Sequence, residues 1–322
     1  MKIVFIVWFP YNRHSELKAQ HLGAKVFFIA YGQRGRLLHT LMKYPIQAWR
    51  TWLVLHRERP RIIFVQNPPI FCALVAFFYS GWHRARYVID SHTGAFLLAK
   101  WRWSLGLHRW LSRRALATIV HNVDQEKIVK TWGCPYCVLG FTPGNYISKE
   151  PFALDEKFNI AVICNVGEDK WLAELFDAAV LLPDVCFYIT GDSKRIPKSL
   201  LMRKPENCRL TGYLPYGQYV SLLAGVNAVM DLNDLDHTLL MGGFEAVSLG
   251  KPLITSDWPV LRDYFSLGAV YVRNTSQSIC EGVRRVQRDD TGLQRDIAIL
   301  REKLELDWER QFGKLLFLLK ES

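Results

Sequence analysis

Residues 241–257 carry the residue types that hold a diphosphate and a ribose. The run reads Met-Gly-Gly-Phe-Glu-Ala-Val-Ser-Leu-Gly-Lys-Pro and continues as Leu-Ile-Thr-Ser-Asp. Gly242 and Gly243 stand at a predicted loop-to-helix junction, where they let the backbone approach a diphosphate and where a helix N-terminus supplies free N–H groups. Glu245, in the first turn and expected to face solvent, can accept hydrogen bonds from a ribose diol. The pattern predicts a nucleoside-diphosphate cradle.

A second polar group follows a predicted strand in the first half of the chain. Asp90 and His92 belong to the run Asp-Ser-His-Thr-Gly at the end of that strand. Either side chain is a candidate general base, because a base with a pKa near the operating pH is most effective. The alternative is structural, with Asp90 capping the next helix and His92 only orienting it.

Two further loops follow strands of the same half. Asn12, Arg13 and His14 come after the first predicted strand, with Ser15 expected to cap the next helix. Asn67 lies in the run Val-Gln-Asn-Pro-Pro at the end of a third strand. We expect these loops to contact the acceptor of a transferred group.

Short β-branched runs alternate with helical stretches along the whole chain, which predicts parallel sheets covered on both faces. A Pro- and Gly-containing stretch, 141–157, separates two such series. We therefore predict two doubly wound Rossmann-like domains, 1–148 and 149–322, facing each other across a cleft. The predicted strands are 2–9, 25–31, 61–66, 86–90, 117–121 and 136–139, then 159–164, 185–190, 208–213, 227–232, 252–256 and 269–272.

The run Gly-Gly-Phe-Glu-Ala-x3-Gly-Lys-Pro-x-Ile-Thr-Ser-Asp resembles the donor-site signature of family-4-type GT-B glycosyltransferases (glycosyl transferases group 1). The resemblance implies that Glu245 holds the ribose and that His92 meets the transferred sugar or assists the acceptor. It also implies an α/β GT-B fold. The donor-binding residues that it implies are Gly167, Lys170, Asp192, Ser193, His237, Thr238, Gly242, Gly243, Phe244 and Glu245.

The sequence departs from this family at the transferred sugar. The Glu-x7-Glu motif of the family would place its first glutamate at position 237, where this chain has His237. An arginine of the basic pair that contacts the diphosphate is replaced by Asn165. The stereochemistry of transfer therefore stays open. Residues 65–69 also resemble a segment of the mannosyltransferases that extend lipid-linked chitobiose, which favours a lipid-diphosphate acceptor.

Positive charge is concentrated in the first half of the chain. Residues 1–150 hold 21 Lys and Arg against 6 Asp and Glu, whereas the remainder holds 20 against 24. The helical stretches 34–59 and 96–114 mix these bases with tryptophans, a composition that suits an anionic membrane surface. The alternative is a buried Trp face with a solvated basic face. No nucleic-acid motif accompanies the basic residues, so we do not expect a nucleic-acid partner.

Seven cysteines without a secreted framework, no signal peptide and no apolar run of about 20 residues predict a cytoplasmic protein at the inner face of the membrane. The leading hypothesis is a glycosyltransferase, with a hexose as the expected sugar, that extends a lipid-linked acceptor in surface polysaccharide or glycolipid assembly. We expect no cofactor and no obligatory metal. The alternatives are a GT-B-fold nucleotide-sugar epimerase and a non-catalytic subunit that binds nucleotide sugars.

Overall fold

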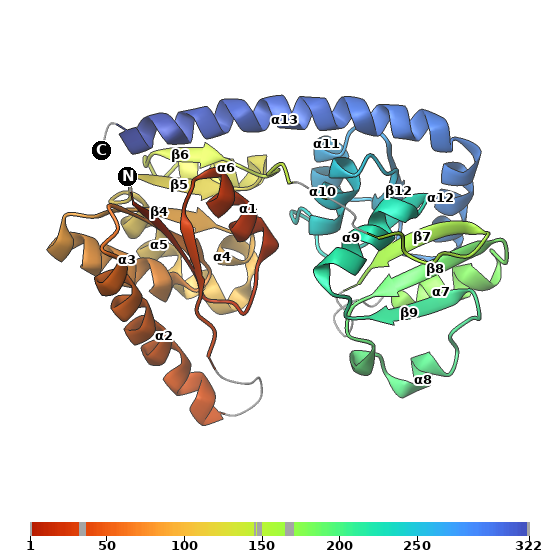
Figure 1. The fold of residues 1–322 in the computed structure, drawn as a ribbon, viewed down its shortest axis with the longest axis horizontal. Coiled ribbons are helices and arrows are strands. Elements are labelled where there is room, and N and C mark those ends of the chain that lie inside the picture. The colour runs from red at the N-terminus through yellow and green to blue at the C-terminus, as the bar shows by residue number, and fades with distance from the viewer. Residues whose placement is uncertain (1, 32–36, 145, 147–149, 165–170, 321–322) are drawn as a thin grey trace. The chain divides into compact units, whose positions relative to one another are not determined.

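The computed structural model describes residues 2–31, 37–144, 146, 150–164 and 171–320. The described residues form two parallel six-stranded sheets with helices on their faces (Figure 1). The chain divides into an N-terminal unit, residues 1–142 with 306–322, and a C-terminal unit, residues 143–305. The prediction of two doubly wound α/β domains is confirmed.

The sheet of the N-terminal unit has the strand order β2-β1-β3-β4-β5-β6, with every neighbouring pair parallel. Its central strands are buried except at Arg86, the first residue of β4, since helices cover both faces. The strands are β1 (Ile3–Val7), β2 (Lys25–Phe28), β3 (Ile62–Asn67), β4 (Arg86–Ser91), β5 (Ala117–Val120) and β6 (Tyr136–Val138).

Alternating side chains of these strands feed two separate apolar cores. One core joins Ile6 and Val65 to the helices α2, α3 and α5, and the other joins Phe5 and Phe64 to α1 and the end of α13. The helices of this unit are α1 (Arg13–His21), α2 (Leu37–Glu58), α3 (Ile70–His83), α4 (Gly94–Leu97), the 3-10 helix η1 (Ala99–Ser104), α5 (Leu105–Ser112) and α6 (Val123–Lys130).

The helical stretch predicted over 96–114 is three shorter pieces. Leu98 has extended backbone angles and ends α4. The chain then forms η1, in which Trp101 is buried in the core and Trp103 is exposed. The predicted stretch is therefore helical along most of its length but interrupted at Leu98, where the backbone is extended.

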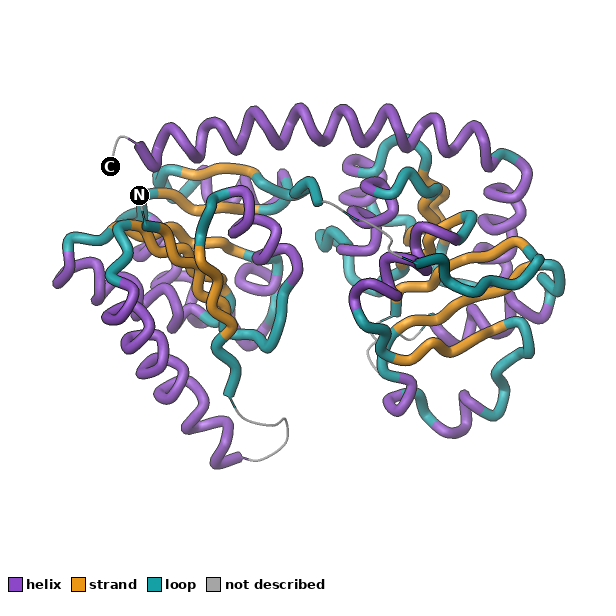
Figure 2. The backbone as a smooth tube through the Cα atoms, in the orientation of Figure 1, coloured by secondary structure: helices purple, strands orange, loops and turns teal. Residues whose placement is uncertain are grey.

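The sheet of the C-terminal unit has the order β12-β11-β10-β7-β8-β9 and is also parallel throughout (Figure 2). Helices α7 and α12 pack against each other over its main core. The strands are β7 (Phe158–Ile163), β8 (Val185–Thr190), β9 (Cys208–Gly212), β10 (Ala228–Asp231), β11 (Leu253–Ser256) and β12 (Ala269–Val272). The helices are α7 (Leu172–Val180), η2 (Ser193–Arg195), α8 (Lys198–Leu201), α9 (Tyr216–Gly225), α10 (Met241–Ser248), α11 (Pro259–Tyr264), α12 (Ser276–Arg288) and α13 (Asp290–Lys320).

Every strand predicted from the sequence has a counterpart, with ends shifted by a few residues. The division between units follows residue 142, six residues before the predicted boundary at 148. Residues 306–322 belong to the N-terminal unit, where Leu315 and Leu319 are buried. In the described part of the chain, no helix has the length and apolar character needed to cross a bilayer.

Candidate active site

A buried charge pair lies at the carboxyl end of β4. Asp90 is fully buried, and its two carboxylate oxygens accept hydrogen bonds from Lys18 Nζ at 2.7 and 2.9 Å. His121, which directly follows β5, places Nε2 2.8 Å from Asp90 Oδ1. Strands β4 and β5 are parallel neighbours, so their carboxyl ends bring these residues together.

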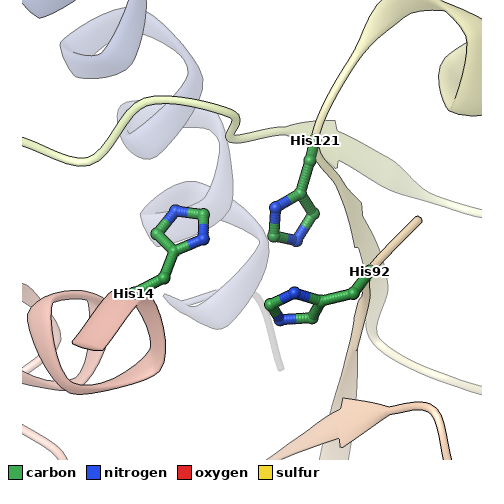
Figure 3. A group of neighbouring side chains, drawn as sticks. All are labelled: His14, His92 and His121. Carbon is green, nitrogen blue, oxygen red and sulfur yellow. The ribbon is translucent and has the colours of Figure 1, made fainter. Parts of the chain in front are cut away.

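Two more histidines adjoin this pair, one of them partly exposed. His92 Nε2 lies 3.5 Å from the nearer oxygen of Asp90, and its side chain is 22% exposed. His14, in the first turn of α1, is buried and places Nε2 3.1 Å from Thr142 Oγ1. Figure 3 shows the rings of His14, His92 and His121 turned toward one another. We call Lys18, Asp90 and these three histidines the polar cluster.

Burial and charge fix the protonation of this cluster. Burial and, after it, the charge of the neighbouring Lys18 together lower the pKa of His121 to about 3. Burial also lowers the pKa of His14. Burial by itself would raise the pKa of Asp90, but the charge of Lys18 outweighs it and holds that pKa well below its usual value. At neutral pH the cluster therefore contains an ion pair beside two neutral imidazoles.

This geometry separates the roles of the two candidate bases. Both oxygens of Asp90 are engaged inside the protein, so we assign it a positioning role toward Lys18 and His121. The side chain of His92 is the more exposed of the two, although its Nε2 is itself buried and, among the described residues, has no hydrogen-bond partner. His92 is thus the member that can reach a bound substrate. Neither residue caps α4, whose N-cap is Thr93.

Sequence reasoning missed Lys18, His121 and Thr142. Two of them carried a usable signal. His121 stands at the end of a predicted strand, at the sheet edge where ligands bind in α/β folds. Lys18 follows His14 by four residues on a helix, which puts both on one face. Thr142 carries no pattern of its own, since only tertiary packing brings it to His14.

The residues predicted on the acceptor side are engaged in local structure. Asn12 is the N-cap of α1 and accepts a hydrogen bond from the backbone N–H of Ser15 at 2.9 Å. The prediction that Ser15 is the cap was therefore wrong, because its backbone is already helical. Arg13 pairs with Glu16 at 2.6 Å.

Asn67 is buried at the end of β3, with its Nδ2 3.1 Å from His108 Nε2. The same nitrogen of His108 lies 2.8 Å from Ser91 Oγ. Asn67 thus helps to fix the ends of β3 and β4, and its expected contact with an acceptor stays a prediction.

In the C-terminal unit, α10 packs closely on the sheet through two glycines. A Cβ added to Gly242 would lie 2.3 Å from Ile163 Cδ1 and 2.4 Å from Asp231 Oδ2. A Cβ added to Gly243 would lie 2.5 Å from Phe265 Cζ. Both glycines are therefore required by packing against β7, β10 and α11, which is a different reason from the approach to a ligand predicted from the sequence.

Glu245 is buried in the middle of α10, whereas the sequence predicted that it faces solvent in the first turn. Its carboxylate accepts a hydrogen bond from Tyr219 Oη at 2.5 Å. Burial and the charge of Glu245 raise the pKa of Tyr219 well above its usual value, so the phenol remains a donor. Tyr219, on α9, was not identified from the sequence, although its hydroxyl now fixes the carboxylate predicted to bind ribose.

The remaining donor-site residues surround the same sheet edge. His237 and Thr238 lie in the loop between β10 and α10, and His237 has a positive φ of 61° beside Asp236. Asp192 follows β8 and caps η2, which includes Ser193, by accepting from the backbone N–H of Lys194. Phe244 is buried against Phe265. Gly167, Lys170 and Asn165 lie outside the described residues.

Part of the chain matches a known family model. Residues 170–307 match a family model described as Glycosyl transferase-like. This segment contains α10 and Glu245. A search of curated proteins found no match.

Solved structures resemble the whole chain. HepE from Anabaena, in complex with UDP-glucose, is 12% identical with a TM-score of 0.71, over 98% of this chain and 99% of that one. Sucrose-phosphate synthase from Thermosynechococcus elongatus is 12% identical with a TM-score of 0.73 over 100% of both chains. A UDP-GlcNAc 2-epimerase from Neisseria meningitidis, bound to UDP-GlcNAc, is 14% identical with a TM-score of 0.63 over 100% of both chains. These likenesses confirm the predicted GT-B fold.

Proposed function

We propose that the protein is a glycosyltransferase that moves a sugar, a hexose by expectation, from a nucleotide-diphosphate sugar to a membrane-held acceptor. The observation that carries the proposal is the buried carboxylate of Glu245 in α10. It lies within the segment that matches the glycosyl transferase-like model. The fold neighbours add support, because HepE was solved with UDP-glucose.

The N-terminus of α10 suits the departing diphosphate. Its N-cap residue, Leu240, makes no side-chain capping hydrogen bond. The first N–H groups of a helix together with its dipole form an anion site. Lys194 and Arg195 of η2 add exposed positive charge at the end of β8. Such preorganised donors stabilise the charge that develops as the sugar–phosphate bond breaks, so an obligatory metal is not required.

His92 is the proposed contact of the N-terminal unit with the reacting groups. A neutral imidazole can accept the proton of an acceptor hydroxyl while the hydroxyl oxygen attacks the anomeric carbon. The bond from that carbon to the diphosphate breaks in the same transfer. Asp90 and Lys18 hold His121 beside the His92 ring, whose centroid is 4.4 Å away. Retention or inversion depends on groups that bind the sugar itself.

An exposed aromatic surface supports the membrane part of the proposal. It extends over α2, α3, η1 and α5, whose other faces pack on the core. Exposed bases accompany it, among them Arg50, Lys100, Arg102 and Arg109. Interfacial tryptophans with Lys and Arg favour anionic headgroups. The aromatic surface consists of Trp49, Leu53, Phe78, Trp82, Trp103 and Trp110, which are 39% to 73% exposed. It would place the enzyme at the inner face of the membrane, where lipid-linked sugars of surface polysaccharides are assembled.

A nucleotide-sugar 2-epimerase is the second candidate, because epimerases from Neisseria meningitidis and Listeria monocytogenes share the fold. It would turn over a donor without an acceptor. A non-catalytic binding subunit, suggested by His237 at the glutamate position, would bind a donor and turn over none.

The first test is a melting screen against UDP, GDP, dTDP, CDP and ADP. A ligand that binds only the folded state raises the melting temperature by mass action. We expect one diphosphate to stabilise the protein selectively, and its sugar forms are then assayed with and without lipid-linked acceptors. Stabilisation by none of the five would remove the donor site and with it the proposed activity.

A further inference from the structure

Three histidines of the N-terminal unit converge from three different elements. His14 lies in α1, His92 follows β4 and His121 follows β5. One ring nitrogen of each lies within 4.8 Å of one from each of the others (Figure 3). We propose that these three imidazoles form a binding site for a divalent transition metal, with Zn²⁺ as the preferred ion.

The outer hydrogen bonds of two rings have the arrangement found around metal-bound histidines. His14 Nε2 meets the hydroxyl of Thr142 at 3.1 Å, and His121 Nε2 meets the carboxylate of Asp90 at 2.8 Å. Metal-binding histidines donate one ring N–H to such an oxygen, which orients the ring and increases its basicity. When Nε2–H of His14 donates to Thr142 and Nε2–H of His121 donates to Asp90, the lone pair of each ring is on Nδ1. Nδ1 is then the nitrogen that binds the metal.

Next to burial, the charge of Lys18 lowers the pKa of both His14 and His121, so it opposes a cation at this place, and Asp90 offsets it only in part. Both oxygens of Asp90 accept hydrogen bonds from Lys18 Nζ at 2.7 and 2.9 Å. Lys18 Nζ lies 3.4 Å from His121 Nε2, the nitrogen on the Asp90 side of that ring. The pair is neutral as a whole, but Lys18 lies close enough to weaken metal binding, so the three imidazole ligands must outweigh that repulsion.

The donor set selects the class of metal. Three imidazole nitrogens suit Zn²⁺, Cu²⁺ and Ni²⁺, whereas Mg²⁺ and Ca²⁺ require oxygen ligands. Three protein ligands also leave a fourth tetrahedral position for a water or a hydroxyl. The partial exposure of His92 gives the ion a route to the site.

Occupation of the site removes His92 from its role in transfer. This consequence rests on the proposed function, whereas metal binding itself does not. The protein should be inhibited by micromolar Zn²⁺ and recover when a chelator is added.

The experiment measures metal binding without any nucleotide or acceptor. The chelator-treated full chain is dialysed against Zn²⁺, and Co²⁺ is added separately to read tetrahedral coordination from its visible absorption. We expect one ion per chain, and binding at least tenfold weaker in His14→Gln and in His92→Gln. Gln has about the length of His but is a poor ligand for zinc. Because His92 is partly exposed, His92→Gln should fold normally and so tests the site even if His14→Gln does not fold. His21→Gln is the control for surface histidines.

Thr142→Val tests the outer hydrogen bond. Loss of such a partner weakens metal affinity by about 10- to 100-fold. No stoichiometric binding by the wild type, or equal binding by wild type, His14→Gln and His92→Gln, would overturn the site. Stoichiometric binding with no donor stabilisation in the melting screen would keep the metal site and reject the transferase.

Discussion

The polar cluster of the N-terminal unit and the cradle of the C-terminal unit are held together in different ways. The cluster joins side chains from α1, β4 and the end of β5 around a buried ion pair. The cradle is one continuous segment, in which the backbone of α10 approaches the sheet through Gly242 and Gly243. The cluster is therefore sensitive to the charge of single side chains, and the cradle to their volume.

Lys18→Met should have the largest effect. It leaves the carboxylate of Asp90 buried without its cation, and breaking a buried pair in this way costs about 3–5 kcal/mol. Denaturant unfolding of the N-terminal unit measures the change. The double variant Lys18→Met with Asp90→Asn should recover part of the loss, since it removes the unpaired charge. A loss below about 1 kcal/mol in the single variant would contradict the pairing.

Gly242→Ala should have the second-largest effect on the free energy of unfolding, and it should destabilise the C-terminal unit. The new Cβ would meet Ile163 and Asp231, and such overpacking costs about 1–3 kcal/mol. Gly217→Ala is the matched control, because Gly217 lies in α9 with nothing within 4 Å of an added Cβ. Alanine in that helix should be neutral or slightly stabilising. Equal effects of both substitutions on the free energy of unfolding would refute the packing argument.

Acid should destabilise the N-terminal unit through His108. Burial lowers the pKa of His108 to about 3, below the ordinary value of about 6.5 that it regains on unfolding. Below pH 6.5 the unfolded chain binds a proton that the folded chain refuses, so stability falls with pH until about pH 3.

Between pH 6.5 and pH 5, His108 should account for a loss of about 2 kcal/mol in the free energy of unfolding. Comparing wild type with His108→Gln at both pH values separates the contribution of His108 from those of the other histidines. The histidine of the C-terminal unit, His237, is exposed. The C-terminal transition should therefore change less with pH, and an unchanged slope in His108→Gln would contradict the assignment.

Arg109→Gln should have the smallest effect, on membrane binding alone. An exposed base near an anionic surface contributes about 1 kcal/mol, so affinity for phosphatidylserine vesicles should fall about fivefold, with the difference shrinking at high salt. Arg295→Gln, an equal charge change at an exposed residue of α13 in the C-terminal unit, is the control. Equal losses in both variants would indicate a non-specific charge effect.

The same contrast explains what the sequence could predict. The strands could be predicted because continuous apolar runs such as Ile62–Asn67 are local, and the cradle could be proposed because its residues are contiguous. Lys18 and His121 meet Asp90 only through the order of the strands, and residues 306–322 pack on the N-terminal unit without any local pattern. The burial of Glu245 beneath Tyr219 was missed for the same reason, since α9 precedes α10 by a strand and a loop.

The central claim is that Glu245 holds the ribose of a nucleoside diphosphate. Its most direct test is calorimetric titration of wild type and Glu245→Gln with the diphosphate chosen by the melting screen and with its 2′,3′-dideoxy form. Gln retains an acceptor for Tyr219 but loses the charge, and a hydrogen bond to a charged group contributes about 1.5–3 kcal/mol. We predict that Glu245→Gln binds the diphosphate at least about tenfold more weakly and binds the dideoxy form as the wild type does. Equal affinity of both proteins for the full diphosphate would contradict the account.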